Sequence, residues 1–469
     1  MSKKVTAHEF RRFFVFLLKV LIILIPSLMF FYVVKNFMPS PFYRKGNYLA
    51  TFFYLIILII NINTYDALEI GITPKRDLQV SFVLATTLTN ILAYILVALI
   101  ARSLLNALPM VILTLLQYVV GIIMYEISVS IYQKLYPPRE TVIIYSDSIW
   151  DIETARKFEA QRERYNIKSV VLESAGLDKI KAEIDKYGTV IIGGLELNKR
   201  RTVFDYCYKK GKRIFVIPNI DDVIMQSAHA VRIDDSIVHL VKDRVMSTEQ
   251  RIIKRIIDII FSLLFLIITL PITLITAIAI KAYDGGPVFF KQARLTKDGK
   301  EFNIIKFRSM IVDAEKDGAQ MSTKHDERIT PVGKFIRKTR IDEIPQFINV
   351  LLGDMTVVGP RPERMEYYKI YTKVMPEFYY RTKVKAGVTG LAQIYGRYNT
   401  SFEAKAKMDI YYIENFSIIT DLKLILSTVK VIFSSDATQG FDSGFFDEKD
   451  IEEKSHELEE ELNSKINDN

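Results

Sequence analysis

The sequence predicts a multidomain membrane protein, and three observations carry that prediction. Four long apolar runs fill the first third of the chain, and apolar residues make up 49% of the whole, with 29 Phe and 25 Tyr. A following segment alternates short β-rich runs with polar helices, and a fifth apolar run comes later. We therefore expect a four-helix transmembrane bundle in residues 1–135, a small Rossmann-like α/β domain in 140–242, a mainly α-helical domain in 251–433 and an acidic tail without packed structure in 434–469.

Each of the four N-terminal apolar runs is long enough to cross a bilayer, which takes about 20 residues. The runs cover residues 13–34, 48–65, 80–100 and 107–131. The first run is too long for a cleavable signal peptide and lacks a small-residue cleavage site. Basic residues before it, Lys3, Lys4, Arg11 and Arg12, give a modest positive-inside bias. We expect a cytoplasmic N-terminus, with four crossings returning the chain to the cytoplasm.

The chain has a net charge of +9, although residues 447–469 carry ten acidic and three basic side chains. A basic balance fits nucleic acid, anionic lipid or phosphorylated substrates. The basic residues are scattered among membrane-directed apolar runs and form no DNA- or RNA-binding motif, so we expect no nucleic-acid partner. The single cysteine, Cys207, excludes an internal disulfide and a zinc site built from several cysteines, which favours a reducing, cytosol-facing location.

The middle segment has the alternation typical of a doubly wound parallel sheet. The expected strands are Thr141–Tyr145, Lys168–Leu172, Thr189–Ile192 and Arg213–Ile217. The expected helices are Trp150–Tyr165, Leu177–Tyr187 and Lys199–Lys210. The first strand runs into Ser146-Asp147-Ser148 rather than the glycine-rich turn of a dinucleotide site, and Gly193-Gly194 is a lone pair. We expect degenerate or absent nucleotide binding, and a regulatory or oligomerisation role.

Residues 256–280 form the fifth apolar run, and two placements fit it about equally. By length the run is a transmembrane helix. A proline inside it, Pro271, breaks one backbone hydrogen bond and permits a bend, so the run could instead enter the inner leaflet and return to the same side. We expect this re-entrant helix, with Lys254 and Arg255 at headgroup level facing lipid phosphates.

Two adjacent carboxylates, Asp342 and Glu343, open an expected short helix with Pro345 in its first turn. Downstream, two prolines of fixed φ flank Arg361 in the segment Gly359-Pro360-Arg361-Pro362. Taken alone, the carboxylates are common helix capping and the proline-rich segment is a turn. Together, a carboxylate pair and a clamped arginine suggest phosphate chemistry.

Further basic residues in the same part of the chain are candidates for binding substrate phosphates. Lys306 and Arg308 lie in K-F-R-S-M, and Arg337 is one of four basic residues between Pro331 and Arg340. Taken individually, each is a weak signal, because such residues are more often solvated ends of strands and helices. With Arg361, Lys254 and Arg255 they complete the candidate phosphate-binding set.

The order of motifs resembles that of the bacterial sugar transferases known as polyprenyl-phosphate hexose-1-phosphate transferases. The motifs are G-G-P-V-F-F-K-Q, K-F-R-S-M, R-I-T-P-V-G, D-E-I-P-Q, N-V-L-L-G-D-M, V-V-G-P-R-P and G-V-T-G-L-A-Q. The resemblance covers residues 251–433. With four N-terminal spans and a Rossmann-like insert, the chain is similar to the larger members, such as undecaprenyl-phosphate galactose or glucose phosphotransferases.

This resemblance implies roles for the candidate residues. Asp342 would attack the β-phosphorus of a UDP-sugar, UMP would leave, and undecaprenyl phosphate would then accept the phosphosugar from the aspartate. Asp342 and Glu343 would hold Mg²⁺, and Arg361 would stabilise the charge that develops during transfer. The donor would be UDP-glucose or UDP-galactose, in the first membrane step of exopolysaccharide, capsule or O-antigen synthesis. The family also implies a bacterial inner-membrane enzyme with its catalytic domain facing the cytoplasm, and a homodimer.

The chain departs from the family pattern at several positions. Arg340-Ile341 replaces the usual Ser-Leu before Asp-Glu, Thr296 and Ala386 replace a glycine and a proline, and Thr269-Leu270-Pro271 keeps only the proline of a Ser-Pro bend. The segment Ser401–Phe433 is either a packed helix pair or, as we expect, helices lying in the membrane interface. The alternative to an enzyme is a membrane scaffold or sensor that has lost catalysis, and Asp342, Glu343 and Arg361 argue against it. The sequence does not identify the hexose.

Overall fold

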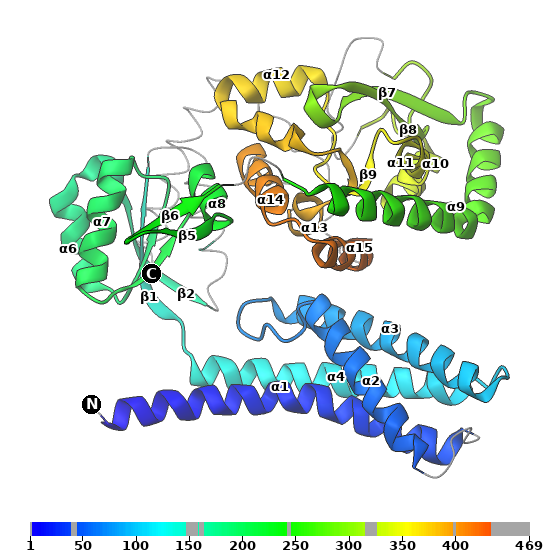
Figure 1. Cartoon of the computed structure of the whole chain (residues 1–469), viewed down its shortest axis with the longest axis horizontal. Coiled ribbons are helices and arrows are strands. Elements are labelled where there is room, and N and C mark those ends of the chain that lie inside the picture. Colours follow the sequence, from blue (N-terminus) through cyan, green and yellow to red (C-terminus); the bar gives the residue numbers. More distant parts are fainter. Residues whose placement is uncertain are drawn as a thin grey trace. The chain divides into compact units, whose positions relative to one another are not determined.

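The computed structural model describes residues 2–38, 45–146, 158, 164–241, 245–314, 326–396 and 400–432, with side chains from residue 9 to residue 429 (Figure 1). The chain forms two compact units, one built on Met1–Arg139 and the other on most of the remaining chain. The predicted acidic tail, 434–469, lies outside the described residues.

The first unit consists of four long helices, and each holds one of the predicted apolar runs. They are α1 (Ser2–Phe37), α2 (Gly46–Thr64), α3 (Lys75–Ala101) and α4 (Leu108–Leu135). Helices α1 and α3 each pack against both α2 and α4. Among the described residues, five helices are long and apolar enough to cross a membrane: these four and α9 of the second unit.

Buried polar side chains connect the four helices of this unit. Tyr54 of α2 donates its hydroxyl to Asn90 of α3 at 3.0 Å, and Asn90 donates to Gln117 of α4 at 2.7 Å. Gln117 in turn donates to the carbonyl of Pro26 in α1 at 3.0 Å. Because lipid offers no hydrogen-bonding partners, these bonds between helices satisfy polar groups that would otherwise be costly to bury.

The second unit begins with the predicted parallel sheet. Its strands are β1 (Arg139–Tyr145), β2 (Tyr165–Leu172), β3 (Thr189–Ile192) and β4 (Arg213–Val216), in the order β2-β1-β3-β4. Strand β3 runs parallel to β1 and to β4, with Thr189 opposite Thr141 on one side and Arg213 on the other. A 3₁₀ turn, η1 (Glu173–Ala175), and helices α6 (Leu177–Lys186) and α7 (Leu197–Lys209) complete the described part.

The core of this domain joins strand and helix side chains such as Ile144, Ile192, Ile184 and Cys207, all fully or almost fully buried. The predicted helix 150–165 falls almost wholly outside the described residues, and its last residue, Tyr165, instead begins β2. The strand therefore starts earlier than predicted.

The sequence interpretation missed three elements after β4. Helix α8 (Ile220–Gln226) opens with a capping box, in which the side chain of Asn219 accepts from the backbone amide of Asp222 and the side chain of Asp222 accepts from the amide of Asn219. Strands β5 (His229–Ile233) and β6 (Ser236–Leu240) form an antiparallel hairpin. Ile220 and Val223 of α8 pack with Ile410 of α14 (Phe402–Glu414), so α8 joins the Rossmann-like domain to the domain that follows.

The last domain is mainly helical, as expected, but it also contains two pairs of strands and is therefore a mixed α/β structure. Helix α9 (Thr248–Asp284) leads into the antiparallel ribbon of β7 (Phe289–Leu295) and β8 (Glu301–Phe307), with the short turn η2 (Lys297–Gly299) between them. Strands β9 (Thr356–Val358) and β10 (Gly387–Thr389) pair in parallel. The remaining elements are α10 (Pro331–Lys338), η3 (Ile341–Glu343), α11 (Gln346–Leu352), α12 (Met365–Val374), η4 (Pro376–Lys383), α13 (Leu391–Tyr395), α14 (Phe402–Glu414) and α15 (Ile418–Ile432).

Helix α9 bends within its length (Figure 1). Its 37 residues would reach roughly 55 Å if straight. Instead, Phe261 and Phe265 pack against a core that includes Phe347 and Val350 of α11, while Ile280, near its far end, packs in a core with Ile336 of α10. Most of its other apolar side chains face outward, and Ile268 and Ile275 are among the most exposed.

Candidate active site

The carboxylate pair lies on a 3₁₀ turn between two helices. Turn η3 follows α10, and α11 begins only at Gln346, with Pro345 as its N-cap residue. The expected short helix is therefore split, since Asp342 and Glu343 do not belong to its α-helical part. Arg340, which opens the turn, adopts a left-handed φ of +59°. Such strain in a residue with a side chain costs roughly 1 kcal/mol or more and concentrates at functional sites.

Glu343 lies among three cations that come from separate elements. Its Oε1 atom is 3.7 Å from the ammonium group of Lys306 on β8. The same atom is 3.5 Å from a guanidinium nitrogen of Arg340 and 3.5 Å from one of Arg361, which follows β9. Burial opposes ionisation, but Lys306, Arg361 and Arg340 outweigh it and lower the pKa of Glu343 below its usual range. Glu343 is therefore ionised and neutralised by its neighbours.

Asp342 has the opposite surroundings. Burial first, and then the charge of Glu343, raise the pKa of Asp342 to about 6, although Lys306, Arg337 and Arg340 act in the other direction. Its Oδ1 atom is buried and has no hydrogen-bond partner among the described residues. A buried polar atom without a partner is rare in a native fold and indicates a group held ready for a ligand or a reaction.

Lys306 supplies a buried positive charge beside both carboxylates. Burial lowers the pKa of Lys306 to about 8, and the attraction of Glu343 opposes that shift. Its side chain is only 18% exposed, so the charge is poorly screened by water. With the neighbouring arginines, it makes this site attractive to a polyanion such as a diphosphate.

Magnesium fits this donor set only in combination with substrate. Among the residues that the structure describes, no group of three or more His, Cys, Asp or Glu side chains could hold a metal ion. Mg²⁺, however, is usually held by one or two carboxylates plus substrate phosphates, rather than by an all-protein cage. The unpartnered oxygen of Asp342 and the adjacent Glu343 match that pattern.

Three predicted phosphate-binding residues have protein partners away from the carboxylate pair. Arg308 is buried, donates to the carbonyl of Pro287 at 2.6 Å and pairs with Asp284. The Lys254 ammonium group donates to the Val358 carbonyl at 3.0 Å and pairs with Asp421.

Arg255 donates to the carbonyls of Val350 and Leu351, at the C-terminal end of α11. These contacts favour structural roles for Lys254, Arg255 and Arg308. By contrast, Lys306, Arg337 and Arg361 do gather with Asp342 and Glu343 in the electrostatics and ion pairs of the site.

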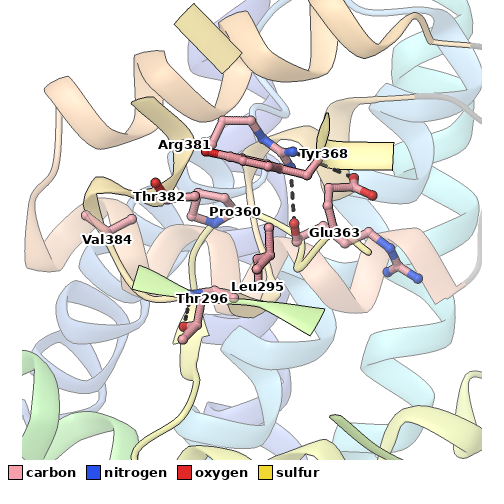
Figure 2. A pocket seen from close by; sticks show the side chains of 10 residues that line it. Leu295, Thr296, Pro360, Glu363, Tyr368, Arg381, Thr382 and Val384 are labelled. Atoms are coloured by element: carbon pink, nitrogen blue, oxygen red, sulfur yellow. Dashed lines mark hydrogen bonds and ion pairs between the residues drawn. The ribbon is translucent and has the colours of Figure 1, made fainter. Parts of the chain in front are cut away.

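A hollow of roughly 290 Å³, including its open mouth, has Arg361 in its lining. Figure 2 shows it from close by. Pro360, Glu363, Tyr368 and Arg381 are among the residues that line it. The sequence interpretation did not single out Glu363 or Arg381. A signal was available for Glu363, which stands next to the second proline of the Gly-Pro-Arg-Pro segment, but nothing near Arg381 in the sequence marked it.

Comparison with known proteins assigns a family to the last domain. A family model described as bacterial sugar transferase matches residues 249–435. A protein of Bacillus subtilis named uncharacterized sugar transferase EpsL is 41% identical over 166 residues, which are 35% of this chain and 80% of that protein. The chain belongs to the bacterial sugar transferase family.

Two larger members of the family are also similar over the same domain. A UDP-N-acetylgalactosamine-undecaprenyl-phosphate N-acetylgalactosaminephosphotransferase of Aeromonas hydrophila is 43% identical over 164 residues, 34% of this chain and 39% of that protein. A UDP-glucose:undecaprenyl-phosphate glucose-1-phosphate transferase of Klebsiella pneumoniae is 46% identical over 161 residues, 33% of this chain and 35% of that protein. The match therefore spans less than two fifths of these relatives and is confined to the sugar transferase domain.

Proposed function

We propose that this protein transfers a hexose 1-phosphate from a UDP-sugar to undecaprenyl phosphate, releasing UMP, as the first membrane step in the synthesis of a surface polysaccharide such as exopolysaccharide, capsule or O-antigen. The observation that carries the proposal is the buried oxygen of Asp342, which lies beside a cluster of cations in the sugar transferase domain and has no hydrogen-bond partner among the residues that the structure describes. The names of the relatives supply the substrate classes.

The reaction would use Asp342 twice. In the first step, a carboxylate oxygen of Asp342 attacks the β-phosphorus of the donor, and the bond from that phosphorus to the oxygen bridging to the α-phosphate breaks. UMP leaves with the bonding electrons, and the phosphosugar remains on the aspartate. In the second step, a phosphate oxygen of undecaprenyl phosphate attacks the same phosphorus and displaces the carboxylate, which restores the enzyme.

The surrounding residues have distinct parts in this scheme. Glu343 draws Lys306, Arg340 and Arg361 together, and these cations balance the charge of the diphosphate in transfer. Asp342 and Glu343 would hold Mg²⁺, which supplies Lewis-acid neutralisation of phosphate oxygens. Burial raises the pKa of Asp342, which makes its carboxylate a better nucleophile than an ordinary one. The group still ionises below pH 7, so it is available to attack phosphorus.

We further propose that α9 is re-entrant and that the sugar transferase domain faces the cytoplasm. A helix crossing the membrane would carry its two ends to opposite sides. Here Arg255, near the start of α9, binds α11, and Ile280, near its end, packs in a core with Ile344, just before α11. Both ends therefore contact one folded domain, and Pro271 lies between them. The homodimer implied by the resemblance stays a prediction.

The test is UMP release by the purified full-length protein with undecaprenyl phosphate, Mg²⁺ and a panel of UDP-sugars. Asp342→Asn is expected to lower release by at least about a thousandfold, because it removes the nucleophile. Glu366→Gln, a change to an exposed carboxylate of α12, serves as the matched control and should leave the rate unchanged.

Without the acceptor, the protein incubated with its donor should gain the mass of one phosphosugar, and Asp342→Asn should not. Full turnover in Asp342→Asn would place the nucleophile elsewhere. The absence of UMP release with every donor would favour a scaffold without transferase activity.

A further inference from the structure

Arg361 reaches Glu343 from a short segment whose backbone is held at every carbonyl. The carbonyl of Pro360 accepts from the amide of Gly387 at 2.8 Å, and that of Glu363 accepts from the amide of Leu295 at 2.9 Å. The carbonyl of Pro362 accepts from the guanidinium group of Arg294 at 3.2 Å. The segment is thus fixed between β7 and β10, and the two prolines restrict it further.

The carbonyl of Arg361 itself is held by a side chain from another element. Arg381, on η4, donates a hydrogen bond to it at 3.1 Å. Another nitrogen of the same guanidinium group lies 3.7 Å from the carboxylate of Glu363, two residues further along, and Figure 2 shows Arg381 and Glu363 side by side. Arg381 therefore spans Pro362 and contacts the chain on both sides of it.

The orientation of Arg381 is in turn fixed by the core. Its Nε atom donates to Asp409 of α14 at 2.7 Å, and its Cζ atom lies 4.6 Å from the centre of the Phe378 ring. The Arg381 side chain is 6% exposed and that of Asp409 is 1% exposed. All three guanidinium nitrogens are thus engaged, in a fork that a lysine could not reproduce.

We propose that Arg381, oriented by Asp409, is a positioning residue for Arg361 in the transfer reaction. Neither Arg381 nor Asp409 is among the groups paired with the carboxylates Asp342 and Glu343. Their effect passes through the backbone of Arg361, which sets where its guanidinium group meets Glu343 and the phosphates of the donor. The inference rests on the proposed function.

The experiment is a double-mutant cycle between Arg381→Lys and Arg361→Gln in the full-length protein, measured as the rate of UMP release at saturating donor. In the wild-type background, Arg381→Lys should lower this rate about 10- to 100-fold, because small displacements of a catalytic group carry penalties of this size. The KM for the UDP-sugar should change less than about threefold. In the Arg361→Gln background, the same change should lower the rate less than about twofold, because the group that it positions is already gone.

Controls separate this role from general damage to the fold. Arg328→Lys removes another arginine fork, which binds Asp326 at 2.8 and 2.7 Å. It should lower the rate of UMP release by the same factor in the wild-type and Arg361→Gln backgrounds. Asp409→Asn, which keeps the shape of the side chain, provides a second cycle if Arg381→Lys does not fold. It should show the same dependence on Arg361.

Effects of Arg381→Lys and Asp409→Asn that are equal in both backgrounds would overturn the positioning role, because a structural defect lowers the rate regardless of residue 361. A wild-type protein that releases no UMP would instead refute the proposed function. The two failures are therefore distinguishable.

Discussion

Replacing the two adjacent carboxylates by their amides should change the stability of the sugar transferase domain in opposite directions. The pKa of Asp342 is raised to about 6, mainly by burial, compared with about 3.9 in an unfolded chain. The folded protein thus holds this proton more tightly than the unfolded chain does. The difference of about two pKa units corresponds to about 3 kcal/mol, at 1.36 kcal/mol per unit. This is an upper value for the increase in the free energy of unfolding that Asp342→Asn brings at pH 7.

The gain should depend on pH in a defined window. Below about pH 4, Asp342 is protonated in both the folded and the unfolded protein. The folded protein then bears no cost of burying a charged carboxylate, so Asp342→Asn brings no increase in stability. The penalty grows as the pH rises from about 4 to 6 and is complete at about pH 7. Glu343→Gln should do the reverse at pH 7 and destabilise the domain, because it leaves Lys306, Arg340 and Arg361 close together without their shared anion.

Thermal unfolding of the detergent-solubilised protein in EDTA, followed by tyrosine fluorescence, measures both effects. The unfolding transition of the sugar transferase domain is identified as the one whose midpoint UDP shifts to higher temperature. For a domain of this size, 1 kcal/mol moves the midpoint by roughly 2–4 °C, so the upper value of about 3 kcal/mol for Asp342→Asn corresponds to a rise of at most about 6–12 °C at pH 7, with almost no rise at pH 4. A fall at pH 7, or a rise that persists at pH 4, would refute the electrostatic reasoning.

Three further outcomes follow from the contacts. The rate of UMP release should rise with pH through about 6 as Asp342 ionises, and more Mg²⁺ should move this limb to lower pH, as pH–rate profiles at two Mg²⁺ concentrations would show. Asp258→Ala should destabilise the sugar transferase domain by about 2–4 kcal/mol, because it removes the acceptor of the Val357 amide and the Thr356 hydroxyl. Thermal unfolding measures this loss, and an unchanged midpoint would contradict the prediction. Asn90→Ala should weaken the N-terminal helices by about 1–2 kcal/mol, seen as unfolding at a lower concentration of sodium dodecyl sulfate, whereas the exposed Ile91→Ala should have little effect.

Much of the architecture could be predicted because it depends on local patterns. The alternation of short apolar runs located Thr189–Ile192 with both ends correct, and the long apolar runs located the N-terminal helices. The hairpin of β5 and β6 was missed because all of its residues are exposed, so no burial pattern marks it.

The partners of charged side chains could not be predicted, since they come from distant parts of the chain. Lys254 and Arg255 precede an apolar run, which is the usual setting of residues that face lipid headgroups. In the fold, Lys254 meets Asp421 and Arg255 meets the end of α11. No local pattern contains that information, because the pairings arise only when α9 packs on α11 and α15.

The different character of Asp342 and Glu343 is the part of the site that the sequence conceals most completely. In the sequence they are neighbouring carboxylates at a helix start. On a 3₁₀ turn, with three residues per turn, neighbouring side chains point about 120° apart and so meet different surroundings. Glu343 meets cations from β8 and from the segment after β9, while one oxygen of Asp342 is buried and has no hydrogen-bond partner in the described part of the chain. On this turn Glu343 balances the charges of the surrounding cations, while Asp342 keeps an oxygen available for the proposed reaction. An ordinary helix-capping role would not require this difference between two neighbouring carboxylates.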